Sequence, residues 1–554
     1  MAEKFYREFV RWGYICGLGL LLISLSQSKV GMSISQFMLA GAFILERVDL
    51  RKVSAYFNRK RDPLFFMELI PYFIFLLFDS IFKGLKLFSR NRPALIFSSV
   101  MLLHLLGLLF STDFEYALKD LRTKLPLFLL PLYISTSQAF GRKAFYWLIL
   151  LFCASLFVRT MINSWYFFHE NFVDIRDVSK SISHLIIALL ISFAIFSLSW
   201  LIARKRSFPL WTKIIFAILI VWFIIYLVMM QSATGLSITA FTLMIFLVFK
   251  VFSRSGRKLK IAIVLLLGGM IFGLALYFNS VAKEYYKVNI VDLTRLGQFT
   301  SRGNQYVHNT KDLSTENGNY IWIYIQWDEL RESWAKKSLM SLDSTDKKSQ
   351  LLLNTLLRFL TSKGERKDGD AVDRLSAKEV KAIENGVANV IFIRDFSIRG
   401  RIYEFLAGYD EYMKTGNPSG STLMQRLEYW KASVGIIHDN WFTGVGTGDM
   451  NEAFQQQYVK MNSKLPVEQR WRAHNQFLSI FVGFGILGII WFLFSIFYPP
   501  SSLGKYRDYF FFVFLVISIL SMIPEETLES QAGVTFFACF YSFLLWGRKE
   551  EDPI

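Results

Sequence analysis

Long apolar stretches recur along this chain and restrict its fold more than any other feature. Stretches such as 213–231, 235–253 and 261–278 are almost uncharged, and each has the length of about 20 residues that a helix needs to cross a bilayer. A spanning segment must pair its own backbone amides and carbonyls, which a helix does. Hydrophobic residues make up 53% of the chain, a composition that excludes an ordinary soluble fold. The sequence therefore predicts an all-α polytopic membrane protein.

The positive charge lies mainly in the short connections between apolar stretches. The net charge of +18 would by itself suggest nucleic acid as a partner. However, Lys and Arg cluster in connections such as 47–61, 83–92 and 204–213, as they do in the cytoplasmic loops of membrane proteins. We therefore expect membrane lipid, and no nucleic acid, around this chain.

Thirteen apolar segments can be distinguished, and the basic connections assign a side to their ends. They lie near 11–27, 33–46, 65–83, 94–111, 124–137, 143–165, 183–203, 210–231, 235–253, 260–278, 474–497, 507–523 and 531–547. Segment 65–83 has basic connections at both ends and contains Glu68, Pro71 and Asp79, so we expect it to be interfacial or re-entrant. About twelve transmembrane helices remain, with both termini cytoplasmic. Thirteen spans, the alternative, would break the charge pattern of the first half.

One long polar segment, 279–473, interrupts the apolar pattern before the last three helices. It is too long for a simple connection, so we expect a folded insertion on the extracytoplasmic side. Apolar residues at intervals of three and four in 351–360 and 423–437 predict helices, and Ser376–Glu379 and Asp449–Glu452 have capping-box spacing. The expected organisation is an N-terminal bundle at 1–278, a mainly helical segment at 279–473, and C-terminal helices at 474–554.

The most informative polar residues lie where this segment re-enters the membrane. His474 follows Arg472 and precedes Asn475 at the start of an apolar stretch. Imidazole titrates near neutral pH and can serve as a general base, and Asn475 could orient the ring or a sugar hydroxyl. The alternative is an interfacial histidine that caps a helix. We predict that Glu525, Glu526 and Glu529 lie near the same membrane face as His474, where they serve either as acid or base groups or as a solvated acidic connection.

These residues carry a resemblance to a known family. His474-Asn475 followed by Gly485-x-x-Gly488 is similar to the signature of the O-antigen ligase and O-antigen polymerase superfamily, and the blocks 425–430 and 440–448 resemble the sequence that precedes it there. The resemblance implies an inverting, metal-independent glycosyltransferase without a cofactor. It further implies a donor glycan on undecaprenyl diphosphate, used at the periplasmic face of the bacterial inner membrane.

The same resemblance leaves the acceptor open. A lipid A core sugar would make the protein a ligase, another carrier-linked glycan would make it a polymerase, and a protein hydroxyl would make it an oligosaccharyltransferase. A polysaccharide transporter or flippase is a further alternative, but the polar residues gather in one outward segment and no two related halves are evident. A scaffold without catalytic activity would leave the motif spacing unexplained.

The resemblance also implies roles for charged residues. Arg426 is expected to hold the carrier diphosphate, because guanidinium groups neutralise phosphate well. Arg472 is either a second phosphate contact or a headgroup anchor, and Glu428 either steers Arg426 or forms a surface pair. Lys119 and Arg122, with Lys124, lie in an early outward loop and either grip the diphosphate or extend toward the membrane surface.

Two further expectations concern glycines and a missing arginine. The turn at 444–448 could bind phosphate at a helix start, but we expect Asp449 to cap those amides and the turn to be structural. Related ligases have an arginine beside a serine near the outer end of a middle helix, whereas 230–235 contains none. Either a loop residue such as Arg302, Arg399 or Arg401 replaces it, or the donor lies differently.

Overall fold

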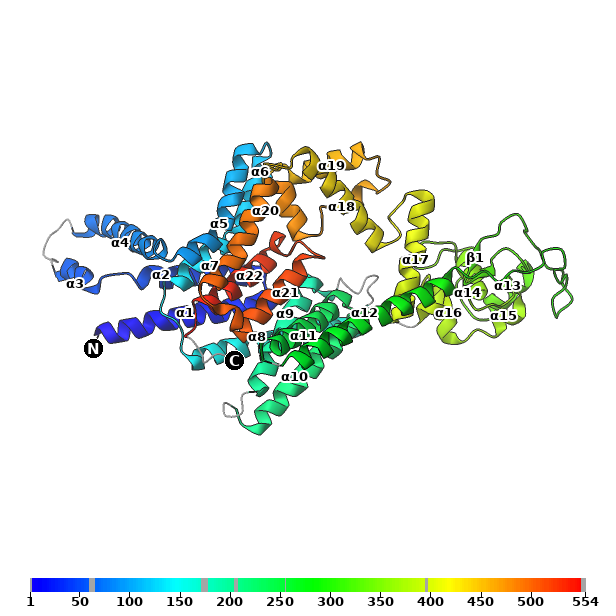
Figure 1. Ribbon diagram of the computed structural model, residues 1–554, viewed down its shortest axis with the longest axis horizontal. Coiled ribbons are helices and arrows are strands. Elements are labelled where there is room, and N and C mark those ends of the chain that lie inside the picture. The colour runs from blue at the N-terminus through cyan, green and yellow to red at the C-terminus, as the bar shows by residue number, and fades with distance from the viewer. Residues whose placement is uncertain are drawn as a thin grey trace. The chain divides into compact units, whose positions relative to one another are not determined.

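The computed structural model describes residues 2–58, 65–170, 178–203, 208–254, 256–393 and 397–549. These residues form mostly helices, as Figure 1 shows. The helices are α1 (Ala2–Gln27), α2 (Lys29–Leu45), α3 (Leu50–Asn58), α4 (Phe65–Phe88), α5 (Arg92–Gly107), α6 (Phe114–Lys124), α7 (Pro126–Ser135), α8 (Arg142–His169), α9 (His184–Ala203), α10 (Leu210–Met229), α11 (Ala233–Arg254), α12 (Arg257–Tyr285), α13 (Trp327–Ala335), α14 (Leu352–Ser362), α15 (Gly369–Asp373), α16 (Ala377–Glu384), α17 (Ile398–Thr415), α18 (Thr422–Asp439), α19 (Met450–Lys460), α20 (Gln476–Ser502), α21 (Tyr509–Met522) and α22 (Gln531–Leu545).

Among the described residues, eight helices are long and apolar enough to cross a membrane. They are α1, α5, α8, α9, α10, α11, α12 and α20, and the shorter apolar helices are α2, α21 and α22. The all-α polytopic class is therefore confirmed, whereas twelve spans are not, since α7 in the expected segment 124–137 has only 10 helical residues. The segment 65–83 lies within the single helix α4, which contains Pro71. Its interfacial or re-entrant placement stays a prediction.

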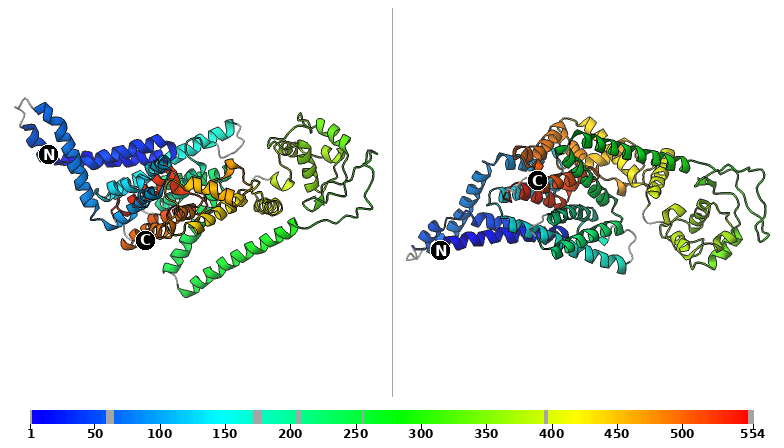
Figure 2. Two further views of the ribbon diagram at one scale, coloured as in Figure 1. Left: turned by 90° about the horizontal axis from the view of Figure 1, so that it is seen from above. Right: turned by 60° about the horizontal axis from the view of Figure 1, so that its bottom comes forward.

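The chain divides into two compact units, and the larger one combines residues 1–253 with 426–554. Helix α22 lies in its core: every residue from Ala532 to Leu545 is buried, as expected for a helix that is apolar on all sides. It packs against α7 and α21. Helices α1 and α2 run side by side (Figure 2), and α5 packs along α20. The large apolar surface left exposed on α10 and α11 suits a lipid environment.

The smaller unit covers residues 254–425 and contains α12 to α17 with one two-stranded sheet. Strands β1 (Thr315–Glu316) and β2 (Asn319–Tyr320) pair antiparallel. Helices α13 to α16 surround a core that includes Trp334, Leu356 and Phe359. The predicted capping box Ser376–Glu379 is present at the start of α16. The predicted helices at 351–360 and 423–437 are also confirmed, as α14 and α18.

The division differs from the expected soluble segment at both ends. The first boundary precedes α12, and the second places residues 426–473 with the larger unit. Which residues lie outside the membrane stays a prediction. For the candidate site the consequence is direct, because Arg426 and His474 belong to one compact unit.

Candidate active site at the start of α20

His474 lies directly before α20 and is held there from both sides. Asn475 is the N-cap of α20, and its side-chain oxygen accepts a hydrogen bond from the Leu478 amide at 3.1 Å. On the other side, Trp430 of α18 donates its indole N–H to the Ala473 carbonyl at 3.1 Å. His474 has a left-handed backbone with φ of 45°, and its side chain is 34% exposed. The backbone on both sides of His474 is therefore held in place, while its side chain stays partly open to solvent.

Glu525 brings His474 and Arg426 together. His474 Nδ1 lies 3.3 Å from one carboxylate oxygen of Glu525, and Arg426 Nη2 lies 3.9 Å from the other. A carboxylate facing Nδ1 favours the tautomer with the proton on Nδ1, which leaves Nε2 as the proton acceptor. The three groups come from α18, from the residue pair before α20, and from the connection between α21 and α22. The arrangement can place a base and a phosphate-binding cation beside one substrate.

Arg472, two residues away, is 15% exposed and faces protein carboxylates. Its Nη2 lies 3.2 Å from Glu526 and 3.1 Å from Glu529, and its Nη1 donates to the Tyr116 hydroxyl at 3.1 Å. Glu526 also accepts a hydrogen bond from the Ser479 hydroxyl. These contacts favour a structural role for Arg472, in which it ties the start of α20 to the connection before α22. A direct contact with substrate phosphate stays a prediction.

The buried cluster continues from Glu529 into α6. Lys124 Nζ donates to Glu529 at 3.0 Å and to Asp120 at 2.6 Å, and its side chain is only 1% exposed. Asp120 in turn lies 3.3 Å from His104 Nδ1 of α5, although the two are not aligned for a hydrogen bond. Lys124 therefore does not extend toward the membrane surface, because its charge is neutralised inside the protein.

The pKa values of the two glutamates in this cluster are shifted in opposite directions. Burial raises the pKa of Glu526, despite the opposite effect of Arg472. Burial also acts to raise the pKa of Glu529, but Lys124 and Arg472 outweigh it and lower this pKa below its usual range. Lys124 lies against Asp120 and Glu529, and Arg472 lies against Glu526 and Glu529. A balanced cluster avoids the cost of an uncompensated buried charge.

The glycines of the motif build a junction between the 444–448 turn and a break in α20. The amides of Val445 and Gly446 donate to the carbonyls of Val482 and Gly483 at 3.0 and 2.9 Å. Gly485 has φ of 63° and ψ of −164°, a conformation that favours glycine. A Cβ atom there would lie 2.1 Å from the Phe442 carbonyl oxygen. Gly485 is thus required by the close approach of two backbones.

A structural role for the turn at 444–448 is supported, but the prediction that Asp449 caps the helix that follows is wrong. Asp449 makes no side-chain cap for α19. Its carboxylate instead accepts hydrogen bonds from the amides of Thr112 and Asp113, at 2.8 and 2.9 Å for the shortest contacts. The Gly448 amide donates to the Ser111 hydroxyl at 2.8 Å. The Gly448 amide and the Asp449 carboxylate thus join the turn to the connection before α6, while the amides of Val445 and Gly446 bind the break in α20.

The other predicted site residues lie apart from His474. Glu428 is buried, accepts a hydrogen bond from Ser463 at 2.8 Å and lies 3.9 Å from Nζ of the exposed Lys431, so its ion pair is with Lys431. It is two residues from Arg426 on α18, and residues at that spacing do not face each other. Lys119 and Arg122 are exposed on α6 and line a shallow cavity of about 610 Å³ with Tyr116. A grip on the diphosphate stays a prediction for both.

The three suggested replacements for the missing arginine are all paired within the smaller unit. Arg302 lies 3.0 Å from Asp370 and 2.6 Å from Asp373. Arg399 pairs with Glu284, and Arg401 lies 2.8 Å from Glu404. Their charges are already compensated, which makes each a weaker candidate for phosphate.

A different arginine, Arg159 of α8, was not singled out by the motif. It is 7% exposed, and its Nε and Nη2 have no hydrogen-bond partner in the part of the chain that the structure describes. It lies near Tyr226 at the end of α10, which leads into the arginine-free stretch 230–235. A lone arginine inside the apolar run 143–165 is the sequence signal that could have identified it.

Comparison with known families supports this resemblance for part of the chain. Residues 382–493 match the family model described as O-antigen ligase. The matched region includes Arg426, His474 and the glycine junction, while Glu525 lies beyond it. The predicted resemblance to the O-antigen ligase superfamily is confirmed. A comparison with curated proteins finds no match to the chain.

Proposed function

We propose that this membrane protein is a glycosyltransferase of the ligase type, because residues 382–493 match the family model described as O-antigen ligase. It transfers glycan from an undecaprenyl-diphosphate carrier to an acceptor such as lipid A core, at the outer face of the bacterial inner membrane. The observation that carries the proposal is the position of the Glu525 carboxylate, which lies 3.3 Å from His474 and 3.9 Å from Arg426. This contact joins a base and a phosphate-binding group that are far apart in the sequence.

The reaction follows from these groups. Nε2 of His474 takes the proton of the acceptor hydroxyl, and the oxygen attacks the anomeric carbon of the donor sugar. The bond from that carbon to the diphosphate oxygen breaks, and the diphosphate leaves with the electron pair. Glu525 stabilises the imidazolium that forms, while Arg426 stabilises the charge on the leaving group. The attack comes from the face opposite the leaving group, so the configuration inverts, and no step needs a metal ion.

Arg159 takes the place of the family arginine in this proposal. A buried arginine with unpaired nitrogens is costly, and such residues inside membrane helices commonly serve a substrate. By the predicted topology it lies in the outer half of the bundle, near the same end of α10 as residues 230–235. A carrier phosphate would supply the acceptors that its Nε and Nη2 lack.

The test is glycan transfer in membranes supplied with carrier-linked donor and each candidate acceptor. His474→Ala and Arg426→Ala are compared with His438→Ala and Arg295→Ala, whose side chains are 88% and 87% exposed. We expect the first pair to lose transfer by at least about a hundredfold and the second pair to retain it. Equal activity in all four variants would reject the site, and the acceptor that is modified identifies the subtype.

A further inference from the structure

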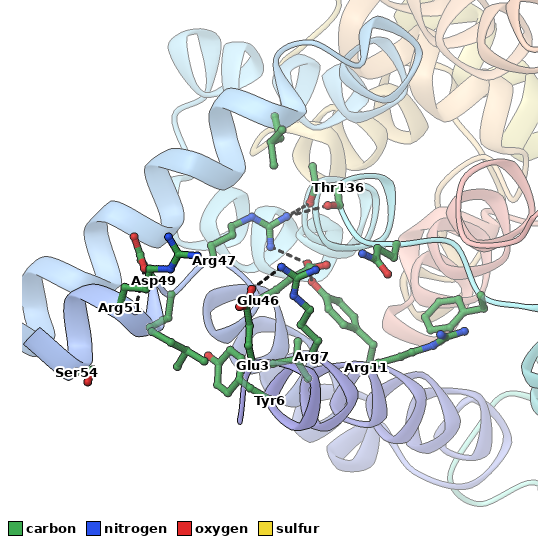
Figure 3. A pocket seen from close by; sticks show the side chains of 17 residues that line it. Glu3, Tyr6, Arg7, Arg11, Glu46, Arg47, Asp49, Arg51, Ser54 and Thr136 are labelled. Atoms are coloured by element: carbon green, nitrogen blue, oxygen red, sulfur yellow. Dashed lines mark hydrogen bonds and ion pairs between the residues drawn. The ribbon is translucent and has the colours of Figure 1, made fainter. Parts of the chain in front are cut away.

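Two cavities outside the candidate active site differ in how far their polar groups are already paired. One, of about 870 Å³, lies between α1, the connection from α2 to α3, and the segment after α7. Figure 3 shows Arg47 directed at Thr136, to which it donates at 2.6 Å. Arg47 also donates to Glu46 at 3.1 Å, and Arg7 donates to Glu3 at 2.6 Å. The central charges of this cavity therefore hold its walls together.

The other cavity lies within the smaller unit, between the segment after β2 and α14. Its volume is about 300 Å³, at the lower end of the range for small-molecule sites. The buried residues Ile321 and Leu357 form part of its wall. A cavity of this size suits a short part of a ligand, not an extended chain. Its lining residues precede the matched region 382–493, so the family match does not account for it.

Trp322 gives this cavity an aromatic side. The residue is partly exposed and lines the cavity. It also packs against the core of the smaller unit, which contains Leu356 and Phe359. The core therefore holds the indole in place before any ligand arrives, which lowers the entropy cost of binding. A fixed aromatic ring offers a large apolar surface with a defined geometry, and the C–H face of a sugar ring packs well on such a surface.

Two amide side chains border the same cavity without partners of their own. Gln350 directly precedes Leu351, the N-cap of α14, and Asn354 follows four residues later, a spacing that places neighbours on one helix face. Both residues are exposed, and no hydrogen bond is found for either side chain across the ranges that the structure describes. A carboxamide carries two N–H donors and one carbonyl acceptor. This combination matches hydroxyl groups, which both donate and accept.

Arg358 continues this row at the same spacing, but its charge is compensated. Its Nε donates to Glu316 at 2.9 Å, and the Glu316 side chain is 13% exposed. The remaining guanidinium N–H groups can still donate to a ligand. Among the described residues that line the cavity, Arg358 is the one charged group. The lining therefore favours an uncharged ligand that is rich in hydroxyl groups.

We propose that this cavity binds a neutral pyranose ring of a glycan chain. Trp322 covers the C–H face of the ring, while Gln350 and Asn354 bind its hydroxyl groups. The choice of glycan as ligand rests on the proposed function, but the cavity shares no residue with the site around His474. The smaller unit thus recognises the glycan, and the group around His474 performs the transfer.

The experiment measures oligosaccharide binding to the purified full-length chain by saturation-transfer NMR, which detects weak contacts. The probes are neutral trisaccharides of glucose, galactose, mannose, rhamnose and N-acetylglucosamine, with a glucuronic acid trisaccharide as the charged counterpart. The detergent carries no sugar headgroup, because such a headgroup would compete. The double variant Q350A/N354A is compared with Q298A/Q305A, which removes two exposed amides of the same unit outside the cavity. Equal unfolding temperatures check that both fold.

We expect Q350A/N354A to bind the neutral probe at least about tenfold more weakly than the native chain, because two hydrogen-bonding groups are lost. Q298A/Q305A should stay within about twofold of the native chain. Trp322→Ala should lose binding to a similar extent, whereas Trp322→Phe keeps an aromatic ring and should retain part of it. Binding of no neutral probe, tighter binding of the glucuronic acid probe, or equal affinities of the two double variants would each overturn the proposal.

Binding and transfer can be separated, because the trisaccharides carry no diphosphate and need no catalysis. His474→Ala should therefore bind the neutral probe as the native chain does. Binding through this cavity in a chain that transfers no glycan to any acceptor would reject the proposed function and leave glycan recognition in place. Transfer by a chain that binds no neutral probe would reject the cavity alone.

Discussion

At the scale of single residues, Glu525 is the group on which the proposed chemistry most depends. Its carboxylate faces His474 Nδ1 at 3.3 Å. Glu525→Gln keeps the shape but removes the charge that stabilises the imidazolium, so we expect transfer to fall at least about tenfold. The rate is measured with saturating donor and acceptor. Glu468→Gln, at an exposed position, is the matched control, and an equal fall in both variants would contradict this role.

Arg159 provides a second test at this scale. If its unpaired nitrogens bind the carrier phosphate, Arg159→Gln should raise the KM for donor by about tenfold or more, the value of a hydrogen bond to a charged group. The unfolding temperature of the Arg159→Gln variant should not fall, because the substitution removes an uncompensated buried charge. Steady-state kinetics and thermal unfolding are measured together. A lower unfolding temperature with unchanged KM would show that Arg159 serves the fold instead.

At the scale of elements, the break in α20 depends on one glycine. Gly485→Ala would place a Cβ atom 2.1 Å from the Phe442 carbonyl oxygen, at a residue whose φ is 63°. We expect a loss of at least about 2 kcal/mol in stability, together with loss of transfer. Gly268→Ala on α12 is the control, since its Cβ would meet nothing within 4 Å. Equal unfolding temperatures for the two variants would contradict the junction.

The buried cluster joins α6, the start of α20 and the connection before α22. Disrupting its ion pairs should therefore destabilise the packing of all three elements. Glu529→Gln leaves Lys124 and Arg472 without part of their compensation, and we expect about 3 to 5 kcal/mol lower stability at neutral pH. Glu526→Gln removes a carboxyl whose pKa is raised because burial disfavours its charge, so it should cost far less. Thermal unfolding of the two variants at pH 7 makes the comparison, and an equal loss would refute the assigned charges.

The same two residues predict opposite responses to pH. Glu529 has a lowered pKa, so its contribution is complete above the unfolded pKa of about 4.3 and is lost as pH falls through the folded value. Glu526 has a raised pKa, so its contribution is present at low pH and is lost as pH rises through the folded value. Unfolding temperatures measured from pH 4 to pH 9 should therefore decline less steeply toward high pH in Glu526→Gln than in the native chain.

At the scale of the whole molecule, the predicted topology places the segment 279–473 outside the cytoplasm. The side of the membrane can be determined with single cysteines introduced at Ser341 or Ser89. The native Cys16, Cys153 and Cys539 are first replaced. A thiol reagent that cannot cross the inner membrane should label position 341 in cells with a permeabilised outer membrane, and position 89 only after lysis. The reverse pattern would invert the orientation and exclude a periplasmic active site.

Much of this architecture could be predicted because it depends on local signals. Long apolar runs must form helices in a bilayer, so the all-α polytopic class followed from hydropathy alone. The capping box Ser376–Glu379 was predicted correctly because both partners lie within one helical turn. The motif around His474 was equally accessible, since its spacing is preserved within a short stretch of chain.

The rest depended on contacts between distant residues, which no local pattern encodes. Asp449 has the spacing of a cap, but the amides of Thr112 and Asp113, more than 330 positions earlier, bind its carboxylate instead. In the sequence, Glu525 could be identified only as one residue of an acidic connection. Its proposed role follows from the packing that brings α18 beside the start of α20. Hydropathy and motif spacing therefore established the class and the candidate base. The partner of that base and the charge balance behind it were decided by tertiary packing, because burial makes each charge depend on its neighbours.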